Sequence, residues 1–467
     1  MSATKRATYH LFASICQGLF GLISITLVIP ALSNKELGYV AALETLTYFF
    51  ANVAGLNLDR AASRFYFNRE DSQYRWDVFS TLNTVAFLSI ILSVLLVLVL
   101  RGAVVCIFPD VPFWPLVTLA LARVSLEIAG RIEQSYLIAS GQSKRYALGI
   151  ILSGATNVGL SVVLVTIYKY GVIGFLAAQL SAALLLLIYL FIASMQNRGS
   201  GKFDLRILSS ALSYAWPFIP TLIVAWVLSY YDRVLINRFL GIEKLGIYAL
   251  ATMMASPFLL VSGAVTKTIL PTFYSVYGTV EGTTVTDYRL EFSRAVIHIF
   301  GCTALFALTV GSVLLEILLG SRVEQAMVYF GFIVVIYWVN SVVFLPSELL
   351  MLAKATKLNM MVSILLAILS LILNYWLIQQ IGIIGAIVSG LTAAIVGFIA
   401  HLYVACRFMP MRFSNGAYIY VLLVLLATAT ITVWFKDWQS KFILLLIGGV
   451  IFSRGTLNGI KFLRRHG

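Results

Sequence analysis

Residues 34–43 read NKELGYVAAL, and residues 242–251 read IEKLGIYALA. The two stretches align without a gap at an offset of 208 residues, with a leucine–glycine pair at the same place in each. A second pair agrees, because GVIGFLAAQL at 171–180 matches GIIGAIVSGL at 382–391 at an offset of 211. Two independent matches at nearly one offset indicate that the chain contains two copies of one unit.

The composition places both copies in a membrane. Of the 467 residues, 60% are hydrophobic and only 11% are charged, and the mean hydropathy is +0.95. In a soluble globular protein about a quarter of the residues are charged. A membrane-spanning helix needs about 20 mostly apolar residues, and stretches of that length recur along almost the whole chain. The sequence therefore predicts an all-α polytopic membrane protein without a soluble domain.

We expect about fourteen transmembrane helices, separated by short polar loops. The predicted spans lie near residues 11–32, 37–58, 78–100, 113–140, 146–168, 171–195, 211–240, 245–266, 292–318, 325–352, 358–379, 382–404, 417–434 and 441–460. The first follows Lys5 and Arg6 as a signal peptide would, but its apolar stretch is too long and no small-residue cleavage site follows. We expect this span to be a retained helix.

The two copies define the predicted domains. Each copy holds six spans, and because this number is even, both enter the membrane in the same direction. We expect parallel six-helix lobes at residues 1–200 and 208–410, followed by two additional spans and a tail at 411–467. Two facing lobes can open a path along their seam to either side alternately. A channel would not require the duplication, although duplication alone does not exclude one.

The net charge of +14 is concentrated in alternate loops. By the positive-inside rule these loops, and with them both termini, are expected to be cytoplasmic. Anionic inner-leaflet lipids would lie beside them, so the charge indicates membrane lipids as partners and not nucleic acid. The basic residues concerned are Arg60, Arg64, Arg69, Arg75, Lys144, Arg145, Arg198, Lys202, Arg206, Lys461, Arg464 and Arg465.

The predicted span at 113–140 contains ARVSLEIAGRIEQSY at 122–136, with charges in its middle. A charged side chain facing lipid at mid-bilayer costs about 3 kcal/mol or more, so these residues should face the protein interior or a water-filled cavity. Successive helical residues turn by about 100°. This rotation places four residues on one polar stripe: Arg123, Glu127, Arg131 and Gln134.

Glu133 lies off this stripe, and we expect it near the inner surface, within reach of Lys144 and Arg145. Other ionisable residues also fall inside predicted spans and are candidates for function. They are Glu44, Asp232, Arg233, His298 and Glu348.

The repeat also places the stretch YYDRVLINRF at 230–239. It aligns Asp232 and Arg233 with positions well inside the first span, so the stretch is predicted to belong to the seventh span and not to a loop. Pro217 and Pro220 at the start of that span lack a backbone donor, and we expect them to let the helix bend.

The polar stripe is absent from the second copy, where the positions matching Arg123 and Glu127 are Ile336 and Asn340. One lobe is thus charged and the other nearly neutral, which suggests that the stripe serves a ligand. Alternatively, an Arg123–Glu127–Arg131 ion ladder pins the span to its neighbours, because i,i+4 spacing favours such pairs. Both readings leave a residual positive charge, which suits phosphate or pyrophosphate.

No motif predicts bond chemistry. The sequence contains no HExxH, P-loop, GxSxG or Rossmann fingerprint, and its four cysteines lack CxxC spacing. A membrane-embedded glycan polymerase would also need a long outer loop, whereas the outer connections expected here are short. We therefore expect no enzyme activity, no metal site and no cofactor.

The duplicated leucine–glycine motif, the G-x-I-G start of spans 6 and 12, Asp232–Arg233 and the 6+6+2 layout together resemble a known family. The chain resembles the polysaccharide-transporter branch of the multidrug/oligosaccharidyl-lipid/polysaccharide (MOP) exporter superfamily, in particular Wzx-type O-antigen flippases. This resemblance implies a MATE/MurJ-like fold in the bacterial inner membrane. It also implies movement of an undecaprenyl-pyrophosphate-linked oligosaccharide from the inner to the outer leaflet, with glycan polymerase and glycosyltransferase partners.

The resemblance implies a cationic cavity, which Arg123, Arg131 and Arg233, with Gln134, would line to bind the headgroup pyrophosphate. The candidates for coupling a proton or a sodium ion are Glu44, Glu127, Asp232 and His298. Two alternatives stay open. A lipid II flippase also has fourteen spans, whereas an ion-coupled multidrug exporter usually has twelve and an acid-rich cavity.

Overall fold

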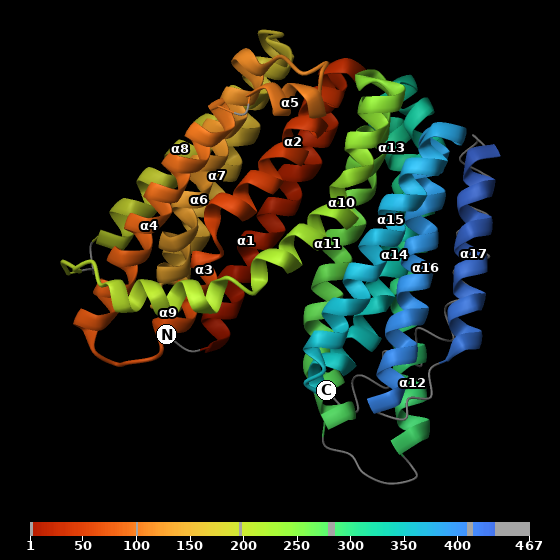
Figure 1. Ribbon diagram of the computed structural model, residues 1–467. Helices are drawn as coiled ribbons and strands as arrows, with labels where there is room; N and C mark the ends of the chain where they lie inside the picture. The colour runs from red at the N-terminus through yellow and green to blue at the C-terminus, as the bar shows by residue number, and fades with distance from the viewer. Residues whose placement is uncertain (1–2, 100, 196–198, 279–284, 409–413, 435–467) are drawn as a thin grey trace. The chain divides into compact units, whose positions relative to one another are not determined.

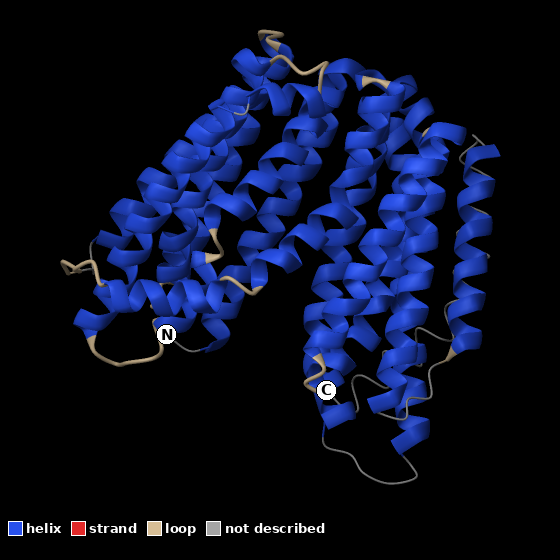
Figure 2. Ribbon diagram, in the orientation of Figure 1, coloured by secondary structure: helices blue, strands red, loops and turns tan. Residues whose placement is uncertain are grey.

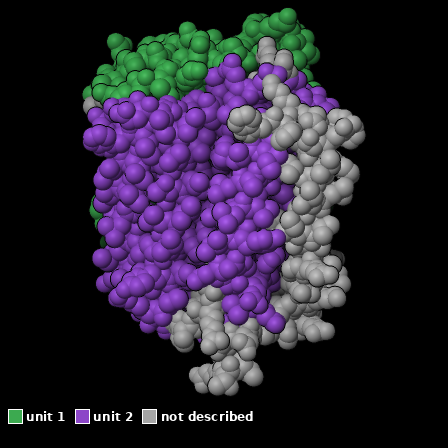
Figure 3. All heavy atoms as spheres, turned by 90° about the vertical axis from the view of Figure 1, so that its right-hand side faces the viewer, with its two compact units in different colours: residues 1–246 green, residues 247–467 purple. Residues whose placement is uncertain are grey.

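The computed structural model describes residues 3–99, 101–195, 199–278, 285–408 and 414–434. Within these ranges every regular element is a helix, and no strand occurs (Figure 2). The chain divides into two compact units, residues 1–246 and 247–467, which are coloured separately in Figure 3. The all-α prediction is therefore confirmed. The predicted lobes were delimited by repetition and not by compactness, and their limits remain predictions.

Unit 1 contains ten helices among its described residues, labelled in Figure 1. They are α1 (Ala3–Ile23), α2 (Asn34–Gly55), α3 (Leu58–Phe65), α4 (Ser72–Val99), α5 (Arg101–Ile107), α6 (Thr118–Ala139), α7 (Ser143–Ser161), α8 (Gly171–Met195), α9 (Leu205–Ala215) and α10 (Phe218–Leu240). Short π- or 3-10-helical turns extend three of them, at Ser24–Val28 and Ile29–Ala31, at Phe113–Val117, and at Val162–Ile167.

The next helix, α11 (Ile242–Gly278), begins in unit 1 and continues into unit 2. The described part of unit 2 adds α12 (Val285–Phe306), α13 (Ser312–Leu319), α14 (Glu324–Leu352), α15 (Thr356–Ile381), α16 (Ile383–Phe408) and α17 (Asn415–Trp434). Further short turns lie at Ala307–Gly311 and Gly320–Val323.

Among the described residues, twelve helical stretches are long and apolar enough to cross a membrane, and each matches a predicted span. The chain is therefore a multi-pass membrane protein. Of the remaining two predictions, 37–58 corresponds to α2, which has 22 residues but is less apolar because it carries Glu44 and Asn52. The other, 441–460, lies outside the described residues.

The repeated leucine–glycine motif forms a contact between its own two copies. Gly38 lies in the first turns of α2 and Gly246 in the first turns of α11. A Cβ atom on Gly246 would collide with the carbonyl oxygen of Asn34, and one on Gly38 with that of Ile242. Only glycine allows the two backbones to approach this closely, which explains why the motif occurs twice.

The second repeated motif also has one role in both copies. Gly171 and Gly382 precede or begin α8 and α16 with positive φ angles of 56° and 64°. Three residues later, Gly174 and Gly385 pack against the backbone of the preceding segment, where a Cβ would crowd Leu164 or collide with the Leu377 carbonyl. The G-x-I-G pattern therefore encodes a tight turn followed by close helix packing.

The seventh predicted span differs from the expectation at its start. The helix is interrupted there and does not merely bend: α9 ends at Ala215, Trp216 and Pro217 form a turn, and α10 begins at Phe218 in a new direction, with Pro217 at its N-cap and Pro220 in its first turn (Figure 1). Proline is tolerated at this position because first-turn amides have no intrahelical partner. The stretch 230–239 is helical, as predicted.

Glu133 is more deeply buried than expected for a side chain near the inner surface, whereas its predicted reach to Lys144 and Arg145 stays a prediction. Its side chain does not reach the surface but is buried, with 2% exposure, and accepts a hydrogen bond of 2.6 Å from Asn83 Nδ2 of α4. Its neighbours Ile132 and Tyr136 belong, with Phe79, to the hydrophobic core of unit 1. The helical rotation predicted that the Glu133 side chain points away from the stripe. It could not predict that α4 covers this side of α6.

Glu36 joins the starts of two helices. With Ser33 it forms a capping box on α2, in which Glu36 Oε2 accepts from the Ser33 amide at 2.8 Å, while Glu36 Oε1 accepts from the Val172 amide of α8 at 3.1 Å. We expect Glu36→Ala to reduce the free energy of unfolding by about 1–3 kcal/mol. Thermal unfolding in detergent measures the change.

Glu243→Ala is the matched control, because Glu243 is an exposed acidic residue in the first turn of α11. Equal melting temperatures for the two variants would contradict the capping role of Glu36.

Candidate functional site

Four helices of unit 1 bring polar side chains together inside the predicted membrane region. α6 packs against α2 and α8, and α10 packs against α2. We call the resulting group the charged cluster. It consists of Glu44, Thr47 and Tyr48 from α2, Arg123 and Glu127 from α6, Gln179 from α8, and Tyr230 and Arg233 from α10.

Arg123 connects three of these helices. Its Nε lies 3.6 Å from Glu127 Oε1, one turn further along α6. Its Nη1 donates to Gln179 Oε1 at 3.1 Å, and its Nη2 donates to Thr47 Oγ1 at 3.4 Å. The guanidinium is therefore held in one orientation by a carboxylate, an amide and a hydroxyl.

Arg233 connects α10 to α2. Its Nη1 lies 3.5 Å from Glu44 Oε2, with side-chain exposures of 13% for the arginine and 39% for the glutamate. The guanidinium also lies 4.7 Å above the Tyr230 ring, which stacks on Tyr48 with centroids 4.7 Å apart. A cation over an aromatic face is stabilised by the ring quadrupole, so Arg233 is positioned by a ring and a charge together.

Arg131 and Gln134 continue the stripe along α6, and both are half-buried. Within the described part of the chain neither makes a hydrogen bond or an ion pair, although Arg131 faces Gly55 of α2. Glu127 pairs with Arg123 and not with Arg131, so the ion ladder is only half formed. Arg131 thus has a guanidinium without a counter-charge among these residues.

The other two predicted coupling residues lie on α10, beside Arg233, and in unit 2. Asp232 accepts a hydrogen bond of 2.8 Å from the Arg233 amide. His298 belongs to unit 2, where its Nδ1 lies 2.7 Å from the Arg294 carbonyl on α12. The structure therefore brings Glu44 and Glu127 to the arginines, but places His298 in the other unit.

Gln179 and Thr47 were not predicted as site residues. A usable signal for Gln179 lies in the repeat, where the matching residue of the second copy is Gly390. In unit 2 a Cβ on Gly390 would lie 3.2 Å from Ile336 Cδ1, and Ile336 matches Arg123. The same two positions therefore meet in both copies, as a polar pair in the first and an apolar pair in the second.

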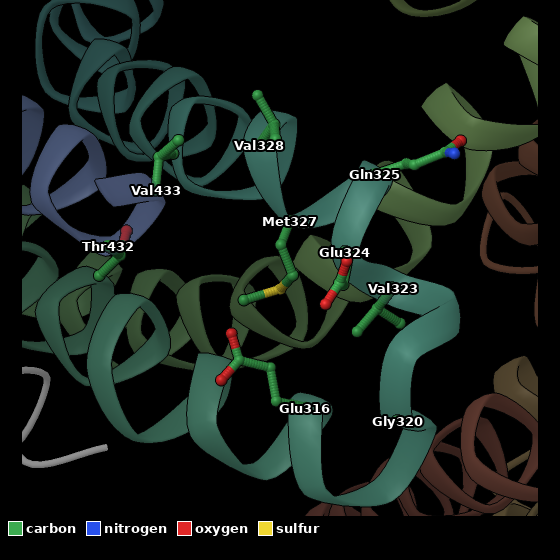
Figure 4. A pocket seen from close by; sticks show the side chains of 9 residues that line it. All are labelled: Glu316, Gly320, Val323, Glu324, Gln325, Met327, Val328, Thr432 and Val433. Atoms are coloured by element: carbon green, nitrogen blue, oxygen red, sulfur yellow. The ribbon is translucent and has the colours of Figure 1, made fainter. Parts of the chain in front are cut away.

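A pocket of about 540 Å³ lies in unit 2, beside α13, α14 and α17. In Figure 4, Glu316, Glu324 and Met327 point into it. Its described lining contains two carboxylates, which belong to Glu316 and Glu324. In the described part of the chain no group of three or more His, Cys, Asp or Glu side chains could hold a metal ion.

Solved structures support the architecture. The chain is similar to a lipid II flippase MurJ in an inward closed conformation (TM-score 0.74, 14% identity, covering 97% of this chain and 98% of that one). It is also similar to an inward-facing MATE family multidrug transporter of the MOP superfamily (TM-score 0.60, 14% identity, 85% and 99% covered). A third is the MATE transporter DinF-BH in complex with R6G (TM-score 0.58, 12% identity, 90% and 97% covered). These similarities confirm the predicted MATE/MurJ-like fold.

Sequence comparison identifies the family. No curated protein sequence matches the chain. The family model described as "Polysaccharide biosynthesis protein" matches residues 30–328, which is more than half of the chain and includes the whole charged cluster. This match agrees with the predicted resemblance to a polysaccharide family. The chain belongs to this polysaccharide biosynthesis protein family.

Proposed function

We propose that this protein is a flippase for an undecaprenyl-pyrophosphate-linked oligosaccharide, such as an O-antigen or exopolysaccharide repeat unit. It moves the lipid from the inner to the outer leaflet of the bacterial cytoplasmic membrane by alternating access, with both termini cytoplasmic. The observation that carries this proposal is the charged cluster with its neighbour Arg131, built into the first copy of a repeat whose second copy has the uncharged residues Ile336 and Asn340 where the first has Arg123 and Glu127. Membership of the polysaccharide biosynthesis family supports it.

The physical need for such a cluster follows from the substrate. A pyrophosphate and its sugar hydroxyls cannot enter hydrocarbon without losing hydrogen bonds worth several kcal/mol each. The polyprenyl tail can stay in lipid throughout. A flippase therefore needs only a polar surface across the membrane for the headgroup, and the charged cluster supplies one in unit 1.

The contacts suggest different tasks for the arginines. Arg131 and Gln134 have no partner among the described residues, so they can take a phosphate without breaking a bond. Arg123 and Arg233 are held by Glu127 and Glu44, which a phosphate would have to replace. Guanidinium binds phosphate through paired charge-assisted hydrogen bonds, which makes this exchange favourable.

Exchange of partners would also provide ion coupling. When a phosphate takes Arg123 or Arg233, the released carboxylate of Glu127 or Glu44 gains a site for a proton or a sodium ion. Asp232 and His298 are the remaining coupling candidates. Glycosyltransferases would supply the lipid-linked substrate, and a glycan polymerase would consume it.

Two other functions compete with this one. The similarity to a lipid II flippase over nearly the whole chain favours a lipid II substrate, which also carries a pyrophosphate. The MATE fold would suit an ion-coupled multidrug exporter. However, the three arginines on α6 and α10 favour an anionic substrate over a cationic drug.

The three functions are separated by removing the protein from its host. We expect lipid-linked repeat units to accumulate on the inner leaflet while surface polysaccharide is lost and growth continues. Accumulation of lipid II with arrested cell-wall synthesis would instead identify lipid II as the substrate. Increased drug sensitivity with normal surface polysaccharide would overturn the flippase assignment.

A further inference from the structure

Two short helices, α3 and α9, lie at one end of unit 1. Their 8 and 11 residues correspond to about 12 and 17 Å, which is too short to cross a membrane. α3 follows directly after α2, and Figure 1 shows α9 running across the ends of the spans and not along them. Helices of this kind lie in the plane of the membrane surface.

α9 is fixed to the rest of unit 1. The Asp77 carboxylate of α4 accepts from the Lys202 amide at 2.7 Å, and Thr81 Oγ1 accepts from the Asp204 amide at 3.0 Å. On its inner face Ala211 is completely buried in the same core as Ala61 of α3. The helix is therefore a rigid part of the surface.

The exposed side of this segment has a large apolar side chain at each end and serines between them. Leu205 and Trp216, at either end of α9, are 70% and 69% exposed. Lys202 and Arg206 lie beside Leu205 in the sequence and are also exposed. Exposed apolar side chains with adjacent basic ones are typical of a segment that inserts its apolar residues into the lipid interface.

Two arginines of α3 are stacked on two aromatic rings beside this segment. The Arg64 guanidinium lies 4.5 Å above the Tyr214 ring, and the Arg60 guanidinium lies 5.2 Å above the Phe218 ring. The two rings contact each other, with centroids 5.5 Å apart. The two arginines are one turn apart on α3, whereas Tyr214 lies in α9 and Phe218 begins α10, so each guanidinium meets its own ring on the facing segment.

These two guanidinium groups keep their donors available. Both side chains are exposed, and no described residue forms an ion pair or hydrogen bond with either. A ring under the face of a guanidinium fixes its orientation and leaves its edge N–H groups free for an oxyanion. Two such groups side by side are preorganised for a phosphate.

We propose that Arg60 and Arg64 form a binding site for the phosphate of an anionic phospholipid headgroup, with Leu205 and Trp216 in the acyl region beside it. The site lies beyond the end of α2, whereas Glu44 of the charged cluster lies within it, so the proposal does not depend on the transported substrate. The loop charges predict that this end faces the inner leaflet, where anionic lipids are found.

The test is a lipid titration of the full-length protein in neutral detergent, with thermal unfolding as the readout. Phosphatidylglycerol should raise the melting temperature of the native protein, whereas phosphatidylcholine should raise it less. Loss of one surface charge weakens such binding about fivefold, so Arg60→Gln combined with Arg64→Gln should weaken it about 25-fold. The effect on the native protein should shrink at about 0.5 M salt.

The matched control is Lys35→Gln with Lys244→Gln, which removes two exposed charges near the starts of α2 and α11. This variant should respond to phosphatidylglycerol as the native protein does. The proposed site would be wrong if the arginine variant kept the native response to phosphatidylglycerol. It would also be wrong if the lysine control lost as much of that response as the arginine variant. Equal stabilisation by inorganic phosphate would show a free-phosphate site instead, and a salt-independent response of the native protein would also overturn the proposal.

Discussion

Arg131→Gln is expected to lower surface polysaccharide about 10- to 100-fold at an unchanged protein level. A hydrogen bond to a charged group contributes about 1.5–3 kcal/mol, and here it would be lost with the phosphate partner. Because Arg131 has no partner among the described residues, its removal breaks no contact there and the melting temperature should stay within a few degrees of the native value. Surface polysaccharide and thermal unfolding are measured on the same variant.

Arg123→Gln should behave differently although it removes the same charge. It deprives Gln179, Thr47 and Glu127 of a common partner, so both transport and thermal stability should fall. Arg101→Gln, which changes an exposed arginine in α5, is the control and should affect neither. Normal polysaccharide from both the Arg131 and Arg123 variants would eliminate the phosphate-binding role.

Gly246→Ala should destabilise the protein more than a single methyl group usually does. The added Cβ would collide with the Asn34 carbonyl at the crossing of α2 and α11, and backbone atoms cannot move aside as a flexible side chain can. Overpacking typically costs about 1–3 kcal/mol, and contact with backbone should place this variant at the upper end. Thermal unfolding in detergent and the amount of protein in the membrane both report the loss.

Gly21→Ala in α1 separates the collision from the general effect of alanine in a helix. A Cβ on Gly21 has nothing within 4 Å, so this variant should be neutral or slightly more stable, because alanine favours helix by about 1 kcal/mol. Gly38→Ala should resemble Gly246→Ala, since its Cβ would meet the Ile242 carbonyl. If Gly246→Ala and Gly21→Ala had the same melting temperature, the close crossing of the two repeated motifs would be wrong.

The fold was readable from the sequence where the signal is local. Apolar length alone located twelve spans, and the repeated glycines pointed to positions where backbones come close. The short helices α3 and α9 were missed because an amphipathic segment of about ten residues produces no hydropathy peak. Function can also weaken the hydropathy signal: α2 is less apolar than the other long helices because it carries Glu44 of the charged cluster.

The partners of the charged residues were harder to predict. Helix periodicity correctly separated Glu133 from the stripe, but it could not show that Asn83 of α4 would cover it. It allowed Glu127 to pair with either arginine, and the choice of Arg123 depends on Gln179 and Thr47 fixing that guanidinium from other helices. Contacts between distant segments are set by packing, which a single sequence does not display.

Reconstitution tests the central claim most directly. The purified protein is placed in liposomes with a fluorescent undecaprenyl-pyrophosphate oligosaccharide, and a membrane-impermeant quencher reports how much label reaches the outer surface. We predict that the native protein, under a proton or sodium gradient, makes the label accessible at a rate that Arg131→Gln lowers about 10- to 100-fold. Label that remains as inaccessible as in protein-free liposomes would contradict the proposed flippase.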